Sequence, residues 1–266
     1  MSIAFSVDLE PNKDGSFDGV AEAMDWYDSV VHHGTVYTTY RVATERPAIV
    51  GGLVEDHEIG VHVHPREFGY TNDDLAALSR DRQRELITET RTAVGDAAGM
   101  ATSELTAFRA GRHKAGPETL AVLADLGFDL DASVHVRYRE YMPAAVTDRV
   151  GPFDHESGLV ELPTTYGQPS LFSRIGLRAG PGGTITATAH ELRSDRRLCR
   201  GTRAVHWLFE ATDGVISMYM HPYDASGYHQ DLENVGEQFR VRLTELLEGS
   251  DRGLVTASDV CASVRD

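Results

Sequence analysis

The sequence predicts one α/β domain over residues 1–266, built on a parallel β-sheet that is either open or closed into a barrel. Short apolar runs with β-branched residues alternate with segments whose apolar residues recur at helical spacing, as in parallel sheets. No internal repeat and no shift in composition marks a linker, and the chain length suits one large domain. Polar side chains directly follow several strand-like runs, which is where α/β folds place their sites.

The expected strands are short runs rich in β-branched and aromatic residues, bounded by turn-forming residues. They cover residues 3–7, 35–42, 59–63, 105–108, 128–130, 159–162, 215–220 and 253–256. Because helical segments separate most of these runs, we expect the strands to be parallel and joined by crossover helices.

The expected helices carry apolar residues three and four positions apart. They cover residues 20–33, 46–54, 73–100, 117–126, 201–210 and 235–248, with a helical turn at the C-terminal end. Gly34 and Gly127 are expected to cap the helices before them, because glycine adopts the left-handed conformation at low cost. Residues 138–157 are expected to form a loop over the site, and the glycine-rich residues 167–183 a loop with little regular structure. Residues 184–193 suit either a strand or a helix.

The net charge of −16 argues against nucleic acid and anionic membranes as partners, because an acidic surface repels phosphates. The basic residues are almost all arginine: of 25 Lys and Arg, only Lys13 and Lys114 are lysine. Many carboxylates with little lysine suggest a high-salt cytoplasm, although GC-rich codon usage also depletes lysine. Unfolding midpoints at low and multimolar KCl would test this hypothesis, and equal stability in both would contradict it.

The first residues run directly into a strand and lack the basic and apolar regions of a signal peptide, which predicts a cytoplasmic protein. No apolar run approaches the ~20 residues of a membrane span. Cys199 and Cys261 make neither a disulfide framework nor a zinc ribbon, and we expect ordinary thiols. The sequence leaves the oligomeric state open.

The most informative stretch is 56–65, which holds three of the 12 histidines, His57, His62 and His64. Imidazole is the commonest metal ligand at neutral pH. A solvated, histidine-rich loop explains this stretch equally well when it is taken alone, so the interpretation depends on the other strand ends.

Reactive side chains follow the predicted strands along most of the chain. They are Asp8, Glu10, His62, His64, Arg109, Asp131, Thr164 and His221. The carboxyl ends of parallel strands lie on one face, so these side chains are expected to converge there. Turns favour polar residues as well, so part of the pattern is expected without a site.

Such a set of residues has a definite chemistry. Two imidazoles and a carboxylate form an open site for a divalent metal, with water in the remaining position. A second carboxylate can act as general base, a histidine from another strand can protonate the leaving group, and an arginine can keep the base ionised. Together these parts describe metal-assisted hydrolysis of an amide or an ester.

Five segments, in order, resemble the motifs of the polysaccharide deacetylases that share the NodB homology domain, carbohydrate esterase family 4. They are Phe5-Ser-Val-Asp8-Leu-Glu10, His57-Glu-Ile-Gly-Val-His62-Val-His64-Pro65, Phe108-Arg109-Ala-Gly-Arg112, Gly127-Phe-Asp-Leu-Asp131-Ala-Ser133 and Tyr219-Met-His221-Pro222. The resemblance implies a distorted parallel (β/α) barrel, a divalent metal, often zinc, and hydrolytic removal of an N- or O-acetyl group from a carbohydrate.

The resemblance also implies roles for the matching residues. Asp8 is the expected base, Arg109 holds this base, and His221 is the expected general acid. The expected metal ligands are Glu10, His62 and His64.

Four further residues are expected to bind the substrate. The backbone N–H of Arg112 is expected to stabilise the oxyanion. Asp131 belongs to a segment that matches a family motif, although the residue alone is better explained as the cap of a turn. Thr164 and Tyr166, together with the glycine-rich loop after them, are expected to shape specificity.

Two departures from the family pattern concern the metal ligands. The second carboxylate of the first motif is Glu10, one position later than in the Asp pair of the family. The family spacing would place Arg66 at the second histidine ligand, so His64 stands two residues early. On an extended segment His62 and His64 still point to the same side, which allows joint ligation.

Three functions fit these residues. The first is a metal-dependent deacetylase of an N-acetylated sugar, such as a glycan precursor or a nucleotide-linked sugar. The second is a cytoplasmic amidohydrolase acting on a cyclic amide, as in the allantoinase-like branch of the family. The third is a carbohydrate-binding or regulatory protein without metal, which the altered histidine spacing would favour. Metal content separates the third from the others, and a panel of N-acetyl sugars and cyclic amides separates the first two.

Overall fold

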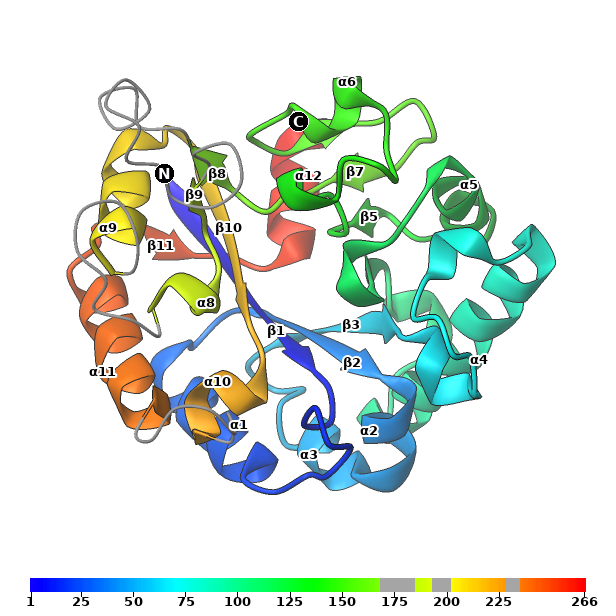
Figure 1. Ribbon diagram of the computed structural model, residues 1–266, viewed down its shortest axis with the longest axis horizontal. Helices are drawn as coiled ribbons and strands as arrows, with labels where there is room; N and C mark the ends of the chain where they lie inside the picture. The colour runs from blue at the N-terminus through cyan, green and yellow to red at the C-terminus, as the bar shows by residue number, and fades with distance from the viewer. Residues whose placement is uncertain (168–184, 193–201, 228–234) are drawn as a thin grey trace.

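The structure is a computed structural model that describes residues 1–167, 185–192, 202–227 and 235–266 (Figure 1). Cys199 and residues 168–183 of the expected glycine-rich loop lie outside the described residues. Cys261 is buried, with its sulfur 3.9 Å from the carbonyl oxygen of Asp129. Among the described helices, none is both long enough and apolar enough to cross a membrane.

The core of the fold is a curled, mostly parallel sheet (Figure 1). Its strand order is β10 (Val215–Met220), β1 (Ser2–Leu9), β2 (Thr35–Thr39), β3 (Glu58–Val63), β4 (Ala107–Ala110), β5 (Leu130–Asp131), β7 (Val160–Glu161) and β6 (Phe153–Asp154). A further strand, β11 (Gly253–Leu254), pairs with the beginning of β1. Only β6 runs antiparallel to its neighbour in this sheet. This architecture confirms the predicted distorted parallel barrel.

Irregular backbone, rather than a strand, bridges β7 and β10. The N–H of Thr165 donates to the carbonyl of Ser217 at 3.0 Å, and the N–H of Ser217 donates to Oγ1 of Thr165 at 2.8 Å. Thr188, which follows β9 (Ile185–Thr186), forms a parallel bridge to Tyr219. Strand β9 itself pairs with β8 (Tyr166–Gly167) in a separate two-stranded ribbon. The barrel is therefore distorted at this one seam.

Helices accompany the sheet, and most of them lie around its outside (Figure 1). They are α1 (Val20–Val30), α2 (Tyr40–Glu45), α3 (Pro47–Gly51), α4 (Arg80–Ala98), α5 (Pro117–Asp125), α6 (Ala144–Thr147), α8 (Ala189–Leu192), α9 (Thr202–Ala211), α10 (Pro222–Ser226), α11 (Val235–Glu248) and α12 (Ala257–Arg265). The C-terminal helix α12 packs its residues Ala257 and Val260 into a smaller apolar cluster with Ala4, Leu130 and Val160. Burial of these apolar faces is the main force that holds the layers together.

Several boundaries differ from the sequence-based expectation. Gly34 is not a cap, because α1 ends at Val30 and Val31 closes its last turn. A Cβ at Gly34 would clash with Tyr27 and with the backbone of Phe5, so close packing explains this glycine. The expected strand 35–42 ends at Thr39, whose hydroxyl accepts a hydrogen bond from the third residue of α2. The ambiguous residues 184–193 form a short strand and then a helix, as far as they are described.

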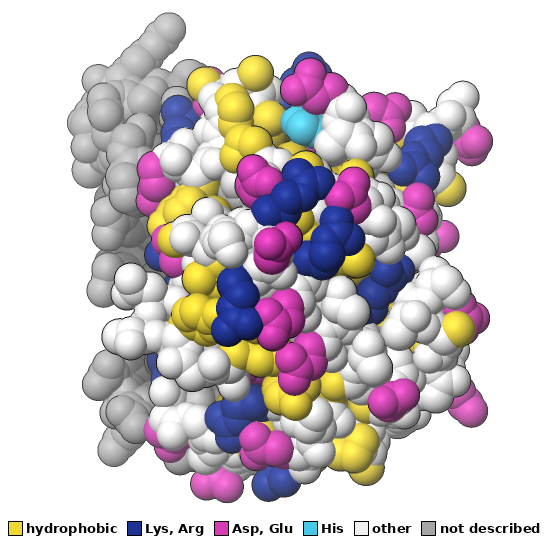
Figure 2. Space-filling view, turned by 90° about the vertical axis from the view of Figure 1, so that its right-hand side faces the viewer, with side chains coloured by type: hydrophobic (Ala, Val, Ile, Leu, Met, Phe, Trp, Pro, Cys, Tyr) yellow, Lys and Arg dark blue, Asp and Glu magenta, His cyan; other side chains and the backbone are white. Residues whose placement is uncertain are grey.

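On the face that carries α4, positive and negative side chains alternate (Figure 2). Arg80 lies 3.2 Å from Glu118 and 2.7 Å from Asp125, and Arg84 also reaches Asp125. These ion pairs are exposed, and such pairs contribute roughly 0–1 kcal/mol each. Arg80 and Arg84 are thus matched by carboxylates.

Candidate metal centre and catalytic pocket

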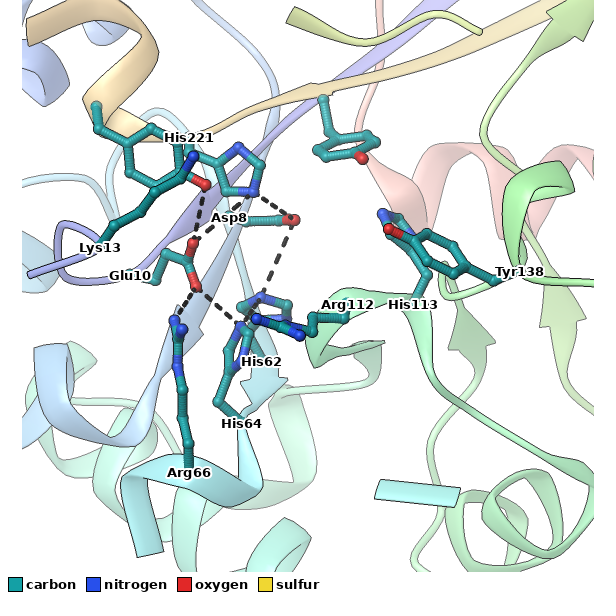
Figure 3. A pocket seen from close by; sticks show the side chains of 12 residues that line it. Asp8, Glu10, Lys13, His62, His64, Arg66, Arg112, His113, Tyr138 and His221 are labelled. Atoms are coloured by element: carbon teal, nitrogen blue, oxygen red, sulfur yellow. Dashed lines mark hydrogen bonds and ion pairs between the residues drawn. The ribbon is translucent and has the colours of Figure 1, made fainter. Parts of the chain in front are cut away.

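The carboxyl ends of three strands bring the predicted metal ligands, Asp8 and His221 to one cavity of about 370 Å³ (Figure 3). Asp8 lies near the end of β1 and Glu10 just after it, so their side chains point to the same side of an extended backbone. The same argument places His62 and His64 together at the end of β3. The cavity is lined by Asp8, Glu10, Lys13, His62, His64, Arg66, Arg112, His113, Tyr138, Tyr219, His221 and Tyr223.

Glu10, His62 and His64 form a triad that could hold a metal ion. Each offers one ligand atom, and the three atoms lie within 4.8 Å of one another. Nε2 of His64 lies 2.8 Å from Oε2 of Glu10 and 3.1 Å from Nε2 of His62. All three side chains are buried. One carboxylate and two imidazoles are a donor set that suits a divalent transition metal such as zinc.

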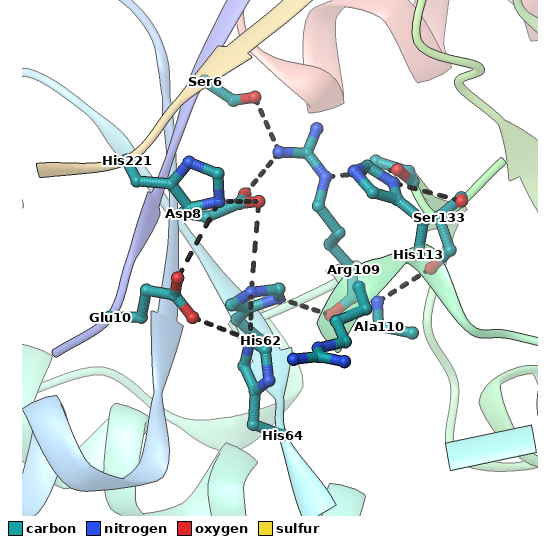
Figure 4. A network of polar contacts seen from close by, with 12 residues as sticks. Ser6, Asp8, Glu10, His62, His64, Arg109, Ala110, His113, Ser133 and His221 are labelled. Atoms are coloured by element: carbon teal, nitrogen blue, oxygen red, sulfur yellow. Dashed lines mark hydrogen bonds and ion pairs between the residues drawn. The ribbon is translucent and has the colours of Figure 1, made fainter. Parts of the chain in front are cut away.

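Each imidazole of the triad is oriented through its other ring nitrogen, as Figure 4 shows for His62. Nδ1 of His62 lies 2.8 Å from the carbonyl oxygen of Arg109, which can only accept, so this nitrogen carries the proton. Nδ1 of His64 lies 2.6 Å from Oδ2 of Asp73. In both cases Nε2 is directed into the triad. Ligating histidines in metal sites are typically held by such contacts, so the residues present fit a metal.

The shortened histidine spacing does not keep His64 away from the triad. The two rings are almost perpendicular, at 89°, with centroids 4.7 Å apart. His64 packs closely on Gly111, where a Cβ would lie 2.6 Å from its Nδ1. The absence of a side chain at residue 111 therefore makes room for the imidazole. His57, the third histidine of the cluster, lies apart and contacts Asp28 at 3.1 Å.

The protonation of the two histidines differs. Burial lowers the pKa of His62 to about 4, although Asp8 opposes the shift, so this ring is neutral. Burial also acts on His64, but Glu10 and Asp73 outweigh it and raise its pKa to about 10. Burial alone would raise the pKa of Glu10, yet contact with His64 holds it far below its usual range. Metal binding would have to replace the proton of His64.

Asp8 and Arg109 form a buried ion pair beside the triad (Figure 4). Nη1 of Arg109 lies 2.5 Å from Oδ1 of Asp8, and both side chains are at most 4% exposed. Burial alone would raise the pKa of Asp8, but the charge of Arg109 and its hydrogen bond to Asp8 outweigh it and hold the pKa below its ordinary value. Asp8 is therefore ionised at neutral pH, as a general base must be.

The guanidinium of Arg109 is held from several sides. It donates to Oγ of Ser6 at 3.0 Å and to the carbonyl of Ala132 at 3.1 Å. Its central carbon lies 4.2 Å from the ring centroid of Tyr37 and 5.1 Å from that of Tyr219. Such stacking lowers the cost of a buried charge. Arg109 itself does not line the cavity and acts through Asp8.

His221 follows the last residue of β10 and lies beside Asp8 and Glu10 in the cavity (Figure 3). Its Nε2 lies 3.9 Å from Oδ2 of Asp8 and 3.8 Å from Oε1 of Glu10. On the other side, Nδ1 lies 3.4 Å from Oδ2 of the fully buried Asp224, and the ring stacks on Tyr223 at 4.6 Å. The ring thus turns Nε2 toward the cavity, where a leaving group could take its proton.

Arg112 reaches the cavity from a strained turn. Arg112 and His113 have φ angles of +54° and +56°, a left-handed conformation that costs non-glycine residues roughly 1–2 kcal/mol each. Both side chains line the cavity as a result, with that of His113 buried and that of Arg112 57% exposed.

The structure places the other three predicted substrate-binding residues outside this cavity. Asp131 and Thr164 are at most 1% exposed and do not line it. Oδ1 of Asp131 accepts hydrogen bonds from the N–H and the hydroxyl of Ser133, so this side chain caps a turn. Tyr166 lines a separate cavity beside Val215, the first residue of β10, whereas His221 follows the other end of that strand.

Asp131 also lies in register with Glu161 on the neighbouring strand β7. Both carboxyl groups are fully buried, and burial raises the pKa of Asp131 to about 6 and that of Glu161 well above its ordinary value. Oδ2 of Asp131 and both oxygens of Glu161 have no hydrogen-bond partner among the described residues. One proton shared between the two groups would supply the missing donor.

Sequence reasoning missed several residues of the cavity wall. His113, Tyr138, Tyr219 and Tyr223 supply its aromatic surface. Tyr219 could have been found, because it precedes His221 by two positions on a strand and so shares its face. His113 is buried, and burial together with His135 and Arg109 holds its pKa well below its usual value, so its ring is neutral.

The comparisons with known proteins agree with this fold. The sequence matches no family model and no curated protein. A Mycobacterium smegmatis protein described as a polysaccharide deacetylase is 16% identical over 99% of this chain and 90% of that chain, with a TM-score of 0.63. A family 4 acetyl xylan esterase from Clostridium thermocellum, solved with a cobalt ion, is 13% identical over 99% and 91%, with a TM-score of 0.55. A family 4 pseudoenzyme from Bacillus anthracis is 10% identical over 98% and 65%, also with a TM-score of 0.55.

The chain has the fold of the family 4 carbohydrate esterases, the polysaccharide deacetylases. This likeness supports the family that the five sequence motifs indicate. Both an esterase and a pseudoenzyme occur among the similar structures, so the fold alone does not settle activity, and the argument for it rests on the residues of the cavity.

Proposed function

We propose that this protein is a metal-dependent hydrolase that removes an acetyl group from an N- or O-acetylated sugar or glycan precursor. One observation carries the proposal: a buried carboxylate–imidazole triad, an ionised Asp8 and His221 all face one cavity. A divalent ion, with Zn²⁺ as the first choice, would be held by Glu10, His62 and His64 and would supply an activated water and polarise the acetyl carbonyl.

Asp8 and His221 would each carry out one of the two proton transfers. Oδ1 of Asp8 is occupied by Arg109, so Oδ2 is the oxygen that would accept a proton from the attacking water. His221 would donate a proton from Nε2 to the leaving nitrogen or oxygen, while Asp224 orients its ring. Asp8 lies on β1 and His221 follows the neighbouring strand β10, so base and acid would both reach an acetyl group bound in the cavity.

The aromatic wall supports a carbohydrate substrate. Tyr138, Tyr219 and Tyr223 line the cavity together with the neutral His113. A sugar presents apolar C–H groups on the faces of its ring, and aromatic surfaces match such faces while their polar edges hydrogen-bond to hydroxyl groups. Arg112 at the cavity mouth would contact the substrate, as its place in the motif suggests.

The test is acetate release by zinc-loaded protein from N-acetylglucosamine oligomers and acetylated xylan, with cyclic amides as the rival class. Asp8→Asn and His221→Ala should each lower kcat by roughly 10²–10⁴-fold while the metal content stays unchanged. His57→Ala is a matched control, because His57 lies outside the cavity. Hydrolysis of a cyclic amide without acetate release would replace the proposal by the amidohydrolase alternative.

A further inference from the structure

We propose that the substrate carries a negatively charged group, a phosphate or a carboxylate, which is held at the cavity mouth by Lys13, Arg66 and Arg112. The inference rests on the proposed function, because it names the chemical class of sugar that the same cavity would accept. Its basis is the distribution of charge, which differs between the cavity and the rest of the molecule.

The cavity gathers cations in a strongly acidic protein. The chain has a net charge of −16 and only two lysines, yet Lys13 lines this cavity together with Arg66 and Arg112. On the face of α4, by contrast, arginines lie 3.2 Å or less from exposed carboxylates. At the cavity, Arg66 and Arg112 instead contact the buried carboxylates Glu10 and Asp73.

Arg112 is the clearest case. Its only ion pair among the described residues is with Asp73, at 3.5 Å through Nε. That carboxylate is already engaged by His64 at 2.6 Å. The guanidinium of Arg112 is therefore loosely held and more than half exposed, and its planar array of donors suits a phosphate or a carboxylate. The strained turn brings this charge to the cavity.

Lys13 and Arg66 flank Glu10 and lie away from Tyr138 (Figure 3). Arg66 contacts Asp73 at 3.6 Å and Glu10 at 3.2 Å, and the ammonium of Lys13 lies 5.3 Å from the ring centroid of Tyr223. Both residues also line a second cavity of about 290 Å³, which includes Arg41. A substrate that extends beyond one sugar would pass these cations.

The charges around the triad sum to a positive site once a metal is bound. The carboxylates that contact the triad or His221 are Asp8, Glu10, Asp73 and Asp224. They face four side-chain cations, Lys13, Arg66, Arg109 and Arg112. A divalent ion would add two further positive charges. A positive cavity in an acidic protein focuses the field on an incoming anion and raises its association rate.

The experiment compares sugars that differ only in charge. The substrates are N-acetylglucosamine, its 6-phosphate, its 1-phosphate and the uronic acid with a carboxylate at C6, each tested with zinc-loaded protein. We expect kcat/KM to be at least about tenfold higher for one or more of the charged sugars. The comparison of phosphate with carboxylate identifies the group. Added KCl should raise the KM of the charged sugars only.

Charge-reversal variants test whether Arg112 and Lys13 bind the anionic group of the substrate. Arg112→Glu and, separately, Lys13→Glu should reduce the preference for the charged over the neutral sugar by about tenfold or more. Arg84→Glu makes the same charge change on the exposed face of α4 and should leave the preference unchanged. The ratio between two substrates is the readout, so a general loss of activity does not mimic the effect.

Binding measurements separate this inference from the proposed function. Calorimetry on zinc-loaded Asp8→Asn reports affinity for the same sugars without turnover. If no sugar releases acetate but the charged sugars bind more tightly, the proposed function fails and the anion site stands. If acetate is released equally well from neutral and charged sugars and the variants change nothing, the anion site is contradicted and the deacetylase stands.

Discussion

Nη1 of Arg109 lies 2.5 Å from Oδ1 of Asp8, inside the barrel, and this contact joins β4 to β1, which β2 and β3 separate in the sheet. The two oxygens of this carboxylate therefore have different partners. Oδ1 is bound by the guanidinium, while Oδ2 faces His62 at 4.0 Å and His221 at 3.9 Å. Arg109 thus keeps Asp8 ionised and orients it, although Arg109 itself does not line the cavity.

Replacing Arg109 should change the pH dependence of the reaction. Arg109→Met removes the charge that lowers the pKa of Asp8, and burial then raises that pKa. The acidic limb of the kcat/KM profile should therefore move to higher pH, and Arg109→Lys should move it less. The variant should also lose about 3–5 kcal/mol of unfolding free energy, because a buried carboxylate loses its partner. An unshifted acidic limb in a folded Arg109→Met protein would contradict the role of Asp8 as the base.

The same pair should appear in the pH dependence of stability. The pKa of Asp8 is lower in the folded state than in the unfolded state, so its contribution is complete above the unfolded pKa of about 4 and is lost as the pH falls through the folded value. Asp8→Asn should flatten the decline of unfolding free energy below pH 4. Denaturant titrations at several pH values measure the unfolding free energy. If it falls with pH as steeply in Asp8→Asn as in wild type, nearby positive charge does not lower the pKa of Asp8 in the folded state.

Asp73 should support the metal through His64. Asp73→Asn removes the anion that lies 2.6 Å from Nδ1 of His64, so metal affinity should fall by about 10–100-fold. Competition with a chelator of known affinity measures the change. The matched control is Asp74→Asn, because Asp74 is the next residue but contacts Lys114 and Tyr141 instead. Equal losses in both variants would assign the effect to the turn rather than to His64.

Metal binding should require a residue without a side chain at position 111. In Gly111→Ala, the added Cβ would lie 2.6 Å from Nδ1 of His64, which forces the imidazole to move. We expect loss of metal binding with retained secondary structure. Gly151→Ala adds the same methyl group where nothing lies within 4 Å, and it should bind metal normally. Normal metal binding by Gly111→Ala would show that His64 does not need its present position.

The buried pair of Asp131 and Glu161 should make the fold less stable as the pH rises. Both pKa values are raised by burial, so the folded state binds protons more tightly than the unfolded chain. Stability therefore falls between the unfolded pKa of about 4 and the folded pKa, about 6 for Asp131. Glu161→Gln should reduce this loss between pH 4 and 8 by about 1–3 kcal/mol. The exposed control Glu156→Gln should not reduce the loss. If unfolding free energy falls equally steeply with pH in wild type and Glu161→Gln, the buried pair is not the cause of the pH dependence.

The fold and the centre of the site were predictable for the same reason. Parallel strands all end at one edge, so a residue that follows an apolar run, such as Asp8 or His221, can be placed without knowing its contacts. The side-chain period of two explains why Glu10 and His64 face the same cavity as Asp8 and His62.

The position of a residue after a strand does not predict its place in the site where the strand end is irregular or where the contact comes from a turn. Thr164 and Tyr166 follow β7, but their backbone continues along β10 toward its beginning, so they leave the site. Asp131 turns its carboxylate to Ser133 and lies against Glu161, a packing outcome that periodicity does not encode. Asp73 comes from a turn nine residues after His64, and no spacing rule identifies it.

The most direct test of the account is the metal content of protein purified without chelator, measured by elemental analysis. We predict about one divalent ion per chain, lost in Glu10→Gln, His62→Ala and His64→Ala and retained in His57→Ala, whose ring contacts Asp28 instead. Wild-type protein that binds no metal even after incubation with zinc would contradict the account, since Asp8 and His221 would then have no activated water to act on.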